Sequence, residues 1–161
     1  MVKQRITKKI RDYREELAAV LSDLISIPTA NPPGRSYRQC VDYLSQRLKE
    51  WGIDHRIIRV PDGEYPRFSI FGSHGKGKRS LHFHGHYDVV PAVSSAQFIP
   101  RLKKGTLYGR GSSDMKSGLV AILYALRLIK ELSLDLKGRI SFSFVPDEET
   151  GGQRGTRALF D

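Results

Sequence analysis

Two kinds of hydrophobic spacing alternate along this chain, and they constrain its fold more than any other feature. Apolar residues recur at helical spacing in three segments, which predict helices over about 4–26, 36–51 and 115–132. Shorter apolar or alternating segments predict strands at 56–60, 68–71, 80–84 and 138–145. Helices that alternate with strands predict an α/β fold in which a mostly parallel sheet lies between helices.

Proline and glycine residues separate these predicted elements. Pro28 ends the first helix, and the rigid Asn-Pro-Pro-Gly loop at 31–34 follows it. A Pro-Asp-Gly turn at 61–63 separates the first two strands. A last helix begins near Gln153 and stops at Asp161 without a Gly or Pro cap, so we expect the chain to be part of a longer one.

The composition excludes several classes of protein. No run of about 18 apolar residues is present, so no transmembrane helix is expected. The single cysteine, Cys40, excludes a disulfide framework and a zinc site built from cysteines. We expect Cys40 to be a packing residue of a helix. The basic N-terminus is not followed by an unbroken apolar segment, which argues against a signal peptide and predicts a cytoplasmic protein.

The net charge of +10 comes from 27 basic and 17 acidic residues and has two explanations. It indicates either an anionic partner, such as nucleic acid or a membrane surface, or a well-solvated surface. The basic residues form small groups at 3–14, 76–79 and 101–104, without the interleaved aromatic residues of a single-strand nucleic-acid groove. We therefore favour the solvated surface and expect no specific nucleic acid and no membrane as partner.

Three polar clusters lie where a predicted strand ends or a predicted helix begins. They are His84–Pro91, Gly109–Lys116 and Pro146–Gly152. Each has an ordinary explanation by itself, since Asp114 suits a helix N-cap and the acidic pair 148–149 suits a helix start. Ligands of open α/β sheets bind outside the carboxyl ends of the strands, so the clusters are expected to meet there. An imidazole and several carboxylates in one place favour a divalent metal such as zinc, because a cation offsets the repulsion between acids.

These clusters resemble, in order and spacing, the three signatures of the M20 metallopeptidases. The matching residues are His86-x-Asp88-x-Val90-Pro91, Gly109-Arg110-Gly-x-x-Asp114-Met115-Lys116-x-Gly118 and Asp147-Glu148-Glu149-x-Gly151. The segment 24–34 is similar to an N-terminal motif of the branch that contains acetylornithine deacetylase and succinyl-diaminopimelate desuccinylase. Aminoacylase and glutamate carboxypeptidase belong to the same family. The resemblance covers about 10–161 and implies a zinc-peptidase-like catalytic domain.

The resemblance implies a role for five residues. His86 would bind one zinc ion, Glu149 would bind a second, and Asp114 would bridge the two. Glu148 would be the general base, which takes a proton from the attacking water and passes it to the leaving amine. Asp88 would accept a hydrogen bond from the other N–H of His86 and so fix its tautomer. Co²⁺ or Mn²⁺ could take the place of Zn²⁺.

The resemblance also implies a substrate and a partner. The substrate would be an N-acyl amino acid or a small peptide, whose amide bond is hydrolysed, and the loop 31–34 favours the deacetylase and desuccinylase branch. A full-length form would be a homodimer. Family members use five metal ligands, whereas this chain offers three. Residues 1–161 would therefore be the N-terminal part of the catalytic domain, without the lid and dimerisation domain and without the C-terminal part.

Two hypotheses follow from this incomplete set of ligands. As the front half of a metallohydrolase, the chain by itself would bind metal weakly and have little hydrolase activity. The alternative is a non-catalytic remnant or a basic binding module that keeps the fold, in which 3–14 contacts an anionic partner. Near the site, His82 and His84 are expected at partly buried strand positions rather than as additional ligands. Arg110 is expected either to hold a substrate carboxylate or to pair with an acid.

Overall fold

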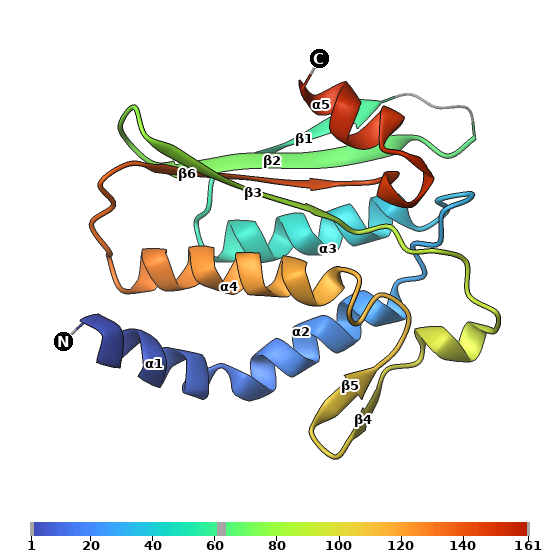
Figure 1. Ribbon diagram of the computed structural model, residues 1–161, viewed down its shortest axis with the longest axis horizontal. Helices are drawn as coiled ribbons and strands as arrows, with labels where there is room; N and C mark the ends of the chain where they lie inside the picture. Colours follow the sequence, from blue (N-terminus) through green and yellow to red (C-terminus); the bar gives the residue numbers. More distant parts are fainter. Residues whose placement is uncertain (1, 61–63, 161) are drawn as a thin grey trace.

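The computed structural model describes residues 2–60 and 64–160, and within them a four-stranded sheet carries helices packed against it (Figure 1). The strands are β1 (His55–Val60), β2 (Arg67–Gly75), β3 (Ser80–His86) and β6 (Arg139–Val145). Their order in the sheet is β1-β2-β6-β3, so β6 lies between β2 and β3. A separate hairpin consists of β4 (Arg101–Lys103) and β5 (Thr106–Tyr108).

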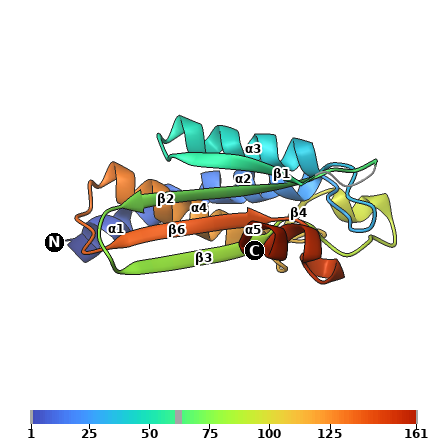
Figure 2. The same ribbon diagram turned by 90° about the horizontal axis from the view of Figure 1, so that it is seen from above.

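The longer helices cover one face of this sheet. They are α1 (Val2–Asp12), α2 (Arg14–Ser26), α3 (Tyr37–Glu50) and α4 (Lys116–Glu131). α3 and α4 lie against the sheet, and α1 and α2 form a further layer beyond α4 (Figure 1, Figure 2). The opposite face carries the π-helical turn Gln153–Arg157 and the short α5 (Ala158–Phe160) (Figure 1). The predicted α/β class is confirmed, although the two faces are covered unequally.

The sheet is mixed, so the prediction of a mostly parallel sheet was wrong. β2 pairs antiparallel with both β1 and β6, while β3 and β6 pair in parallel. The connection from β1 to β2 is short and suits antiparallel neighbours, because a parallel pair needs a crossover of about a dozen residues or more. β3 and β6 have such a crossover, which contains α4.

The first predicted helix, 4–26, is divided into α1 and α2 at Tyr13. The Tyr13 ring is buried, packs edge-on against the ring of Tyr124 in α4, and its hydroxyl donates a hydrogen bond to Glu131. The Arg127 guanidinium lies over the same ring, 4.4 Å from its centroid. Contacts with α4 thus accompany a bend that the continuous hydrophobic spacing of the sequence does not reveal.

The remaining predicted elements are present with small changes at their ends. α3, α4 and β6 confirm the predictions at 36–51, 115–132 and 138–145, and β2 is longer than predicted. The hairpin of β4 and β5 was missed because its strands are short and largely exposed. Its turn uses Lys104 and Gly105, both with positive φ. The predicted turn at 61–63 lies outside the described residues.

The hydrophobic core lies between the sheet and the helices α3 and α4. Phe142 and Phe144 of β6 are fully buried in it, and the serines that alternate with them face the other side of the sheet. Leu119 and Leu123 of α4 are also fully buried, as the apolar character of this helix predicted. None of the helices in the described part of the chain is long and apolar enough to cross a membrane.

Candidate metal centre

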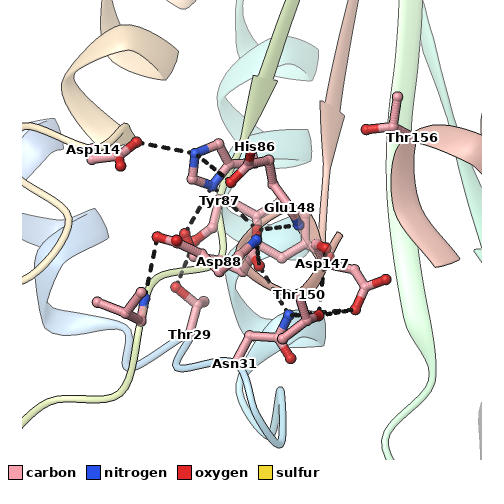
Figure 3. A network of polar contacts seen from close by, with 12 residues as sticks. Thr29, Asn31, His86, Tyr87, Asp88, Asp114, Asp147, Glu148, Thr150 and Thr156 are labelled. Carbon is pink, nitrogen blue, oxygen red and sulfur yellow. Dashed lines mark hydrogen bonds and ion pairs between the residues drawn. The ribbon is translucent and has the colours of Figure 1, made fainter. Parts of the chain in front are cut away.

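Three polar segments meet at one edge of the sheet, beyond the carboxyl ends of β3 and β6 (Figure 3). His86 is the last residue of β3 and is paired in register with Val145 at the end of β6. The acidic pair 148–149 follows β6 after Pro146 and Asp147 and begins a short 3-10 turn. Asp114 comes from the loop that leads into α4. The parallel pairing of β3 and β6 therefore places residues distant in sequence at one site.

The imidazole of His86 is held in one orientation. Its side chain is 7% exposed, and Nδ1 lies 3.0 Å from the Asp88 carbonyl oxygen and 3.2 Å from Asp88 Oδ1. Because Asp88 offers only acceptors there, Nδ1 donates and Nε2 is left for the open side of the site. Nε2 lies 3.1 Å from Asp114 Oδ1 and 3.7 Å from Glu148 Oε2. This is the tautomer that presents Nε2 as a metal ligand.

The charges around His86 favour its protonated form when nothing else neutralises the acids. Burial of the ring opposes protonation, but the hydrogen bond to Asp88 and the charges of Asp88 and Glu148 raise the pKa of His86 to about 9. Burial also raises the pKa of Glu149, against the effect of His86, and the nearby Asp114 charge raises it further. Several carboxylates thus surround a single imidazole, and their negative charges outnumber the one positive charge that a protonated His86 supplies.

One nitrogen of His86 and one oxygen each of Asp114 and Glu149 lie within 4.8 Å of one another. An imidazole with two carboxylates is a donor set that suits zinc, cobalt or manganese. The residues present therefore fit a divalent metal. The sequence-predicted metal ligands are the three residues that the structure brings together in this way.

Glu148 and Asp88 lie beside this group. The Glu148 side chain is 54% exposed, and its backbone N–H donates to Asp88 Oδ1 at 3.2 Å. The Glu149 N–H donates to Asp88 Oδ2 at 3.1 Å, and the Val90 N–H donates to Glu149 Oε1 at 3.2 Å. Asp88 itself is fully buried. A single buried carboxylate thus contacts both His86 and the backbone of the acidic pair.

The remaining residues singled out in the sequence lie around the site. His82 and His84 lie on the sheet face away from α3 and α4, bonded to Ser143 of β6, and are exposed rather than partly buried as predicted. Arg110 lines a cavity of about 220 Å³ beside Asp114 and Glu149. Its Nε is buried without a hydrogen-bond partner among the described residues. Both roles expected for Arg110, holding a substrate carboxylate or pairing with an acid, stay predictions.

Sequence reasoning missed three polar residues beneath the site: Asn31, Asp147 and Thr150. Asn31 and Asp147 are 2% and 4% exposed, and both belong to the hydrogen-bonded network around Asp88 (Figure 3). A signal existed in the sequence, because the loop at 31–34 and the Asp before the acidic pair were both part of recognised motifs. The motifs by themselves did not indicate that Asn31, Asp147 and Thr150 contact one another.

Comparisons with known proteins identify the family of this chain. Residues 82–161 match the model of peptidase family M20/M25/M40. The chain is 33% identical over 153 residues to N-formyl-4-amino-5-aminomethyl-2-methylpyrimidine deformylase of Bacillus subtilis. That alignment covers 91% of this chain and 36% of the deformylase. It is 37% identical over 141 residues to succinyl-diaminopimelate desuccinylase of Buchnera aphidicola, covering 84% of this chain and 35% of that protein.

Solved structures share the fold. The di-peptidase Dug1p from Saccharomyces cerevisiae matches with a TM-score of 0.80 at 20% identity, over 94% of this chain and 36% of that one. Human carnosine dipeptidase 1 matches with a TM-score of 0.75 at 21% identity, over 98% and 37% of the two chains. The chain thus spans somewhat more than a third of the length of these relatives.

The mixed sheet with helices against one face, and the cluster of one imidazole and several carboxylates at the strand ends, define a class of α/β domain with a candidate divalent-metal site. Within that class, the chain belongs to the M20 family of metallopeptidases.

Proposed function

We propose that this chain is the N-terminal part of a metal-dependent amidohydrolase that cleaves an N-acyl amino acid or a small peptide. The observation that carries the proposal is the convergence of His86, Asp114 and Glu149 within 4.8 Å at the sheet edge. The relatives named deformylase and desuccinylase remove an acyl group from an amine, which supports the acyl-amide substrate class. The loop at 31–34 favours the deacetylase and desuccinylase branch.

His86, Asp114 and Glu149 would hold the metal. When bound, a divalent metal lowers the pKa of water and polarises a carbonyl group. Glu148 acts as general base, taking a proton from the attacking water and giving it to the leaving amine. Its exposed carboxylate, 54% accessible and 3.7 Å from His86 Nε2, is free to reach a substrate that occupies the open side of the site. Asp88 stays hydrogen-bonded to His86 and fixes its tautomer.

The number and identity of the metal ions are part of the proposal. Three protein ligands suffice for one zinc ion with an open coordination position. We propose that the complete protein holds two zinc ions, with further ligands and a dimerising lid domain supplied by residues outside 1–161. The chain alone is then expected to bind metal weakly and to hydrolyse little substrate. A cytoplasmic location and the homodimer stay predictions.

The metal-binding proposal is tested by titrating zinc into the metal-free chain by calorimetry. The variants Glu149→Gln and Glu148→Gln form a matched pair, because each replaces one carboxylate by an amide at neighbouring positions. Loss of a ligand should weaken zinc binding by about 100-fold or more in Glu149→Gln, that is about 2.7 kcal/mol. Glu148→Gln should bind zinc within about threefold of wild type.

Two results would contradict this proposal. Equal zinc affinity in both variants would remove the division of roles between the two glutamates. Absence of zinc binding in the wild-type chain would contradict the expectation that His86, Asp114 and Glu149 suffice to hold one zinc ion. In a complete enzyme that contains this segment, Glu148→Gln should abolish turnover of an N-acyl amino acid while the metal content stays unchanged.

A further inference from the structure

Asn31 places a buried side-chain amide beneath the metal-site residues (Figure 3). The residue is 2% exposed, and its Nδ2 lies 3.0 Å from Asp88 Oδ2, 2.8 Å from Thr150 Oγ1 and 3.4 Å from Asp147 Oδ1. Asp88 and Asp147 are themselves 0% and 4% exposed. One amide group therefore joins two buried carboxylates that are far apart in the sequence.

The chemistry of its neighbours determines which end of this amide faces them. Ionised carboxylates only accept hydrogen bonds, and the Thr150 hydroxyl donates its own proton to Asp147 Oδ1 at 2.7 Å. The Thr150 oxygen is thus an acceptor toward Asn31. All three contacts require an N–H donor, so the NH₂ group of Asn31 must point into this space. A buried carboxylate without such donors is unfavourable, which gives the amide a defined task.

The two carboxylates joined by Asn31 hold different parts of the site. Asp88 accepts the backbone N–H groups of Glu148 and Glu149 and lies 3.2 Å from His86 Nδ1. Asp147 accepts the Arg154 N–H at 3.0 Å and the Thr150 hydroxyl, and so closes the turn that carries the acidic pair.

We propose that Asn31 is a positioning residue of the metal centre, which fixes Asp88 against the 147–150 turn and through Asp88 aligns His86 and Glu149. Asn31 touches none of the three predicted ligands in the described contacts and acts through Asp88. Thr150 shares this task, because its hydroxyl links Asn31 to Asp147. The inference rests on the proposed metal-dependent function, and its test therefore includes a readout that needs no metal.

The first readout is zinc affinity, measured by competition with a chelating dye on the metal-free 161-residue chain. Asn31→Leu and Thr150→Val keep the shape of each side chain but remove its polar group. Both should weaken zinc binding by up to about 10-fold, because they act one contact beyond the partner of a ligand, whose own loss weakens binding by about 10- to 100-fold. Thr150→Ser keeps the hydroxyl and should bind zinc as wild type does. Val41→Ala, a fully buried position in α3, should lower the melting temperature without changing zinc affinity.

The second readout is amide hydrogen exchange at Glu148 and Glu149 in the metal-free protein. Both N–H groups donate to Asp88, so Asn31→Leu should accelerate their exchange by about tenfold or more, while amides in β6 change less. If the Glu148 and Glu149 amides of Asn31→Leu exchange at the wild-type rate, the inference is overturned. Unchanged zinc affinity in the variant, with zinc binding by wild type, would overturn it as well.

Failure of the proposed function gives a different result. If the wild-type chain binds no zinc, the expectation that three ligands hold one zinc ion fails, and hydrogen exchange alone decides whether Asn31 aligns the turn. If wild type binds zinc and Thr150→Ser binds it as weakly as Thr150→Val does, the Thr150 hydroxyl does not support zinc binding. That result would overturn the inference. Equal loss of zinc affinity in Val41→Ala would show that the affinity follows stability, which also overturns the inference.

Discussion

Glu131, at the end of α4, ties this helix to the two N-terminal helices. Its carboxylate lies 2.9 Å from Lys9 Nζ and 2.6 Å from Arg127 Nε, and it accepts the hydroxyl of Tyr13. The hydrogen bonds from Tyr13 and Lys9, together with Arg127, outweigh the effect of burial and lower the pKa of Glu131 to about 2. This group therefore stabilises the fold mainly in its ionised form.

The magnitude follows from this pKa. A fall from 4.5 to about 2 amounts to about 3 kcal/mol if it is fully expressed, at about 1.4 kcal/mol per unit. The side chain is 31% exposed, so solvent screening lowers the expected contribution to about 1–2 kcal/mol. Since the folded-state pKa is the lower one, the contribution is present above pH 4.5 and is lost as the pH falls toward 2.

Glu131→Gln should lower the free energy of unfolding by about 1–2 kcal/mol at pH 7, measured by urea denaturation. The difference from wild type should shrink progressively between about pH 4.5 and pH 3. Glu50→Gln is a suitable control, because Glu50 forms an exposed pair with Arg47 and should change stability by less than about 0.5 kcal/mol. A difference that stays constant from pH 7 to pH 3, or that is absent at pH 7, would refute the electrostatic explanation.

Two further substitutions test the packing of the sheet. Tyr87→Phe removes a buried hydroxyl that donates to the Phe68 carbonyl oxygen at 2.6 Å, and denaturation should show a loss of about 1–2 kcal/mol. Gly72→Ala would place a methyl group 2.5 Å from the Phe142 ring and 2.6 Å from the Asp54 carbonyl oxygen. It should lower stability by about 1–3 kcal/mol, and a melting temperature equal to wild type would show that the strand yields easily.

The sequence predicted the elements better than their arrangement. Alternation along β6 and the apolar run of α4 mark these elements directly, because each depends on the burial of neighbouring positions. The direction of β2 and the bend at Tyr13 depend instead on contacts with distant segments. The Tyr13 hydroxyl, for example, bonds to a residue 118 positions away. Hydrophobic spacing within a short window carries no information about such contacts.

The same difference applies to the site. The predicted ligands follow strand ends or precede a helix, so their meeting at one sheet edge follows from the α/β pattern. Asn31 escaped this argument because its partners, Asp88 and Thr150, lie 57 and 119 residues away and its loop ends no strand. Strand order places Asp88 near the acidic pair, but only the packed loop at 31–34 brings the amide between the carboxylates.

The burial of these residues divides the site into two layers. His86 and Asp88 have side chains that are 7% and 0% exposed, whereas those of Asp114 and Glu148 are 76% and 54% exposed. The exposed carboxylates keep rotamer freedom until something binds them, and ordering them costs conformational entropy. The buried layer, which includes Asn31, is already fixed by hydrogen bonds and so reduces the number of groups that binding must order. Metal affinity in this fold should therefore depend on the buried positioning residues as well as on the ligands themselves.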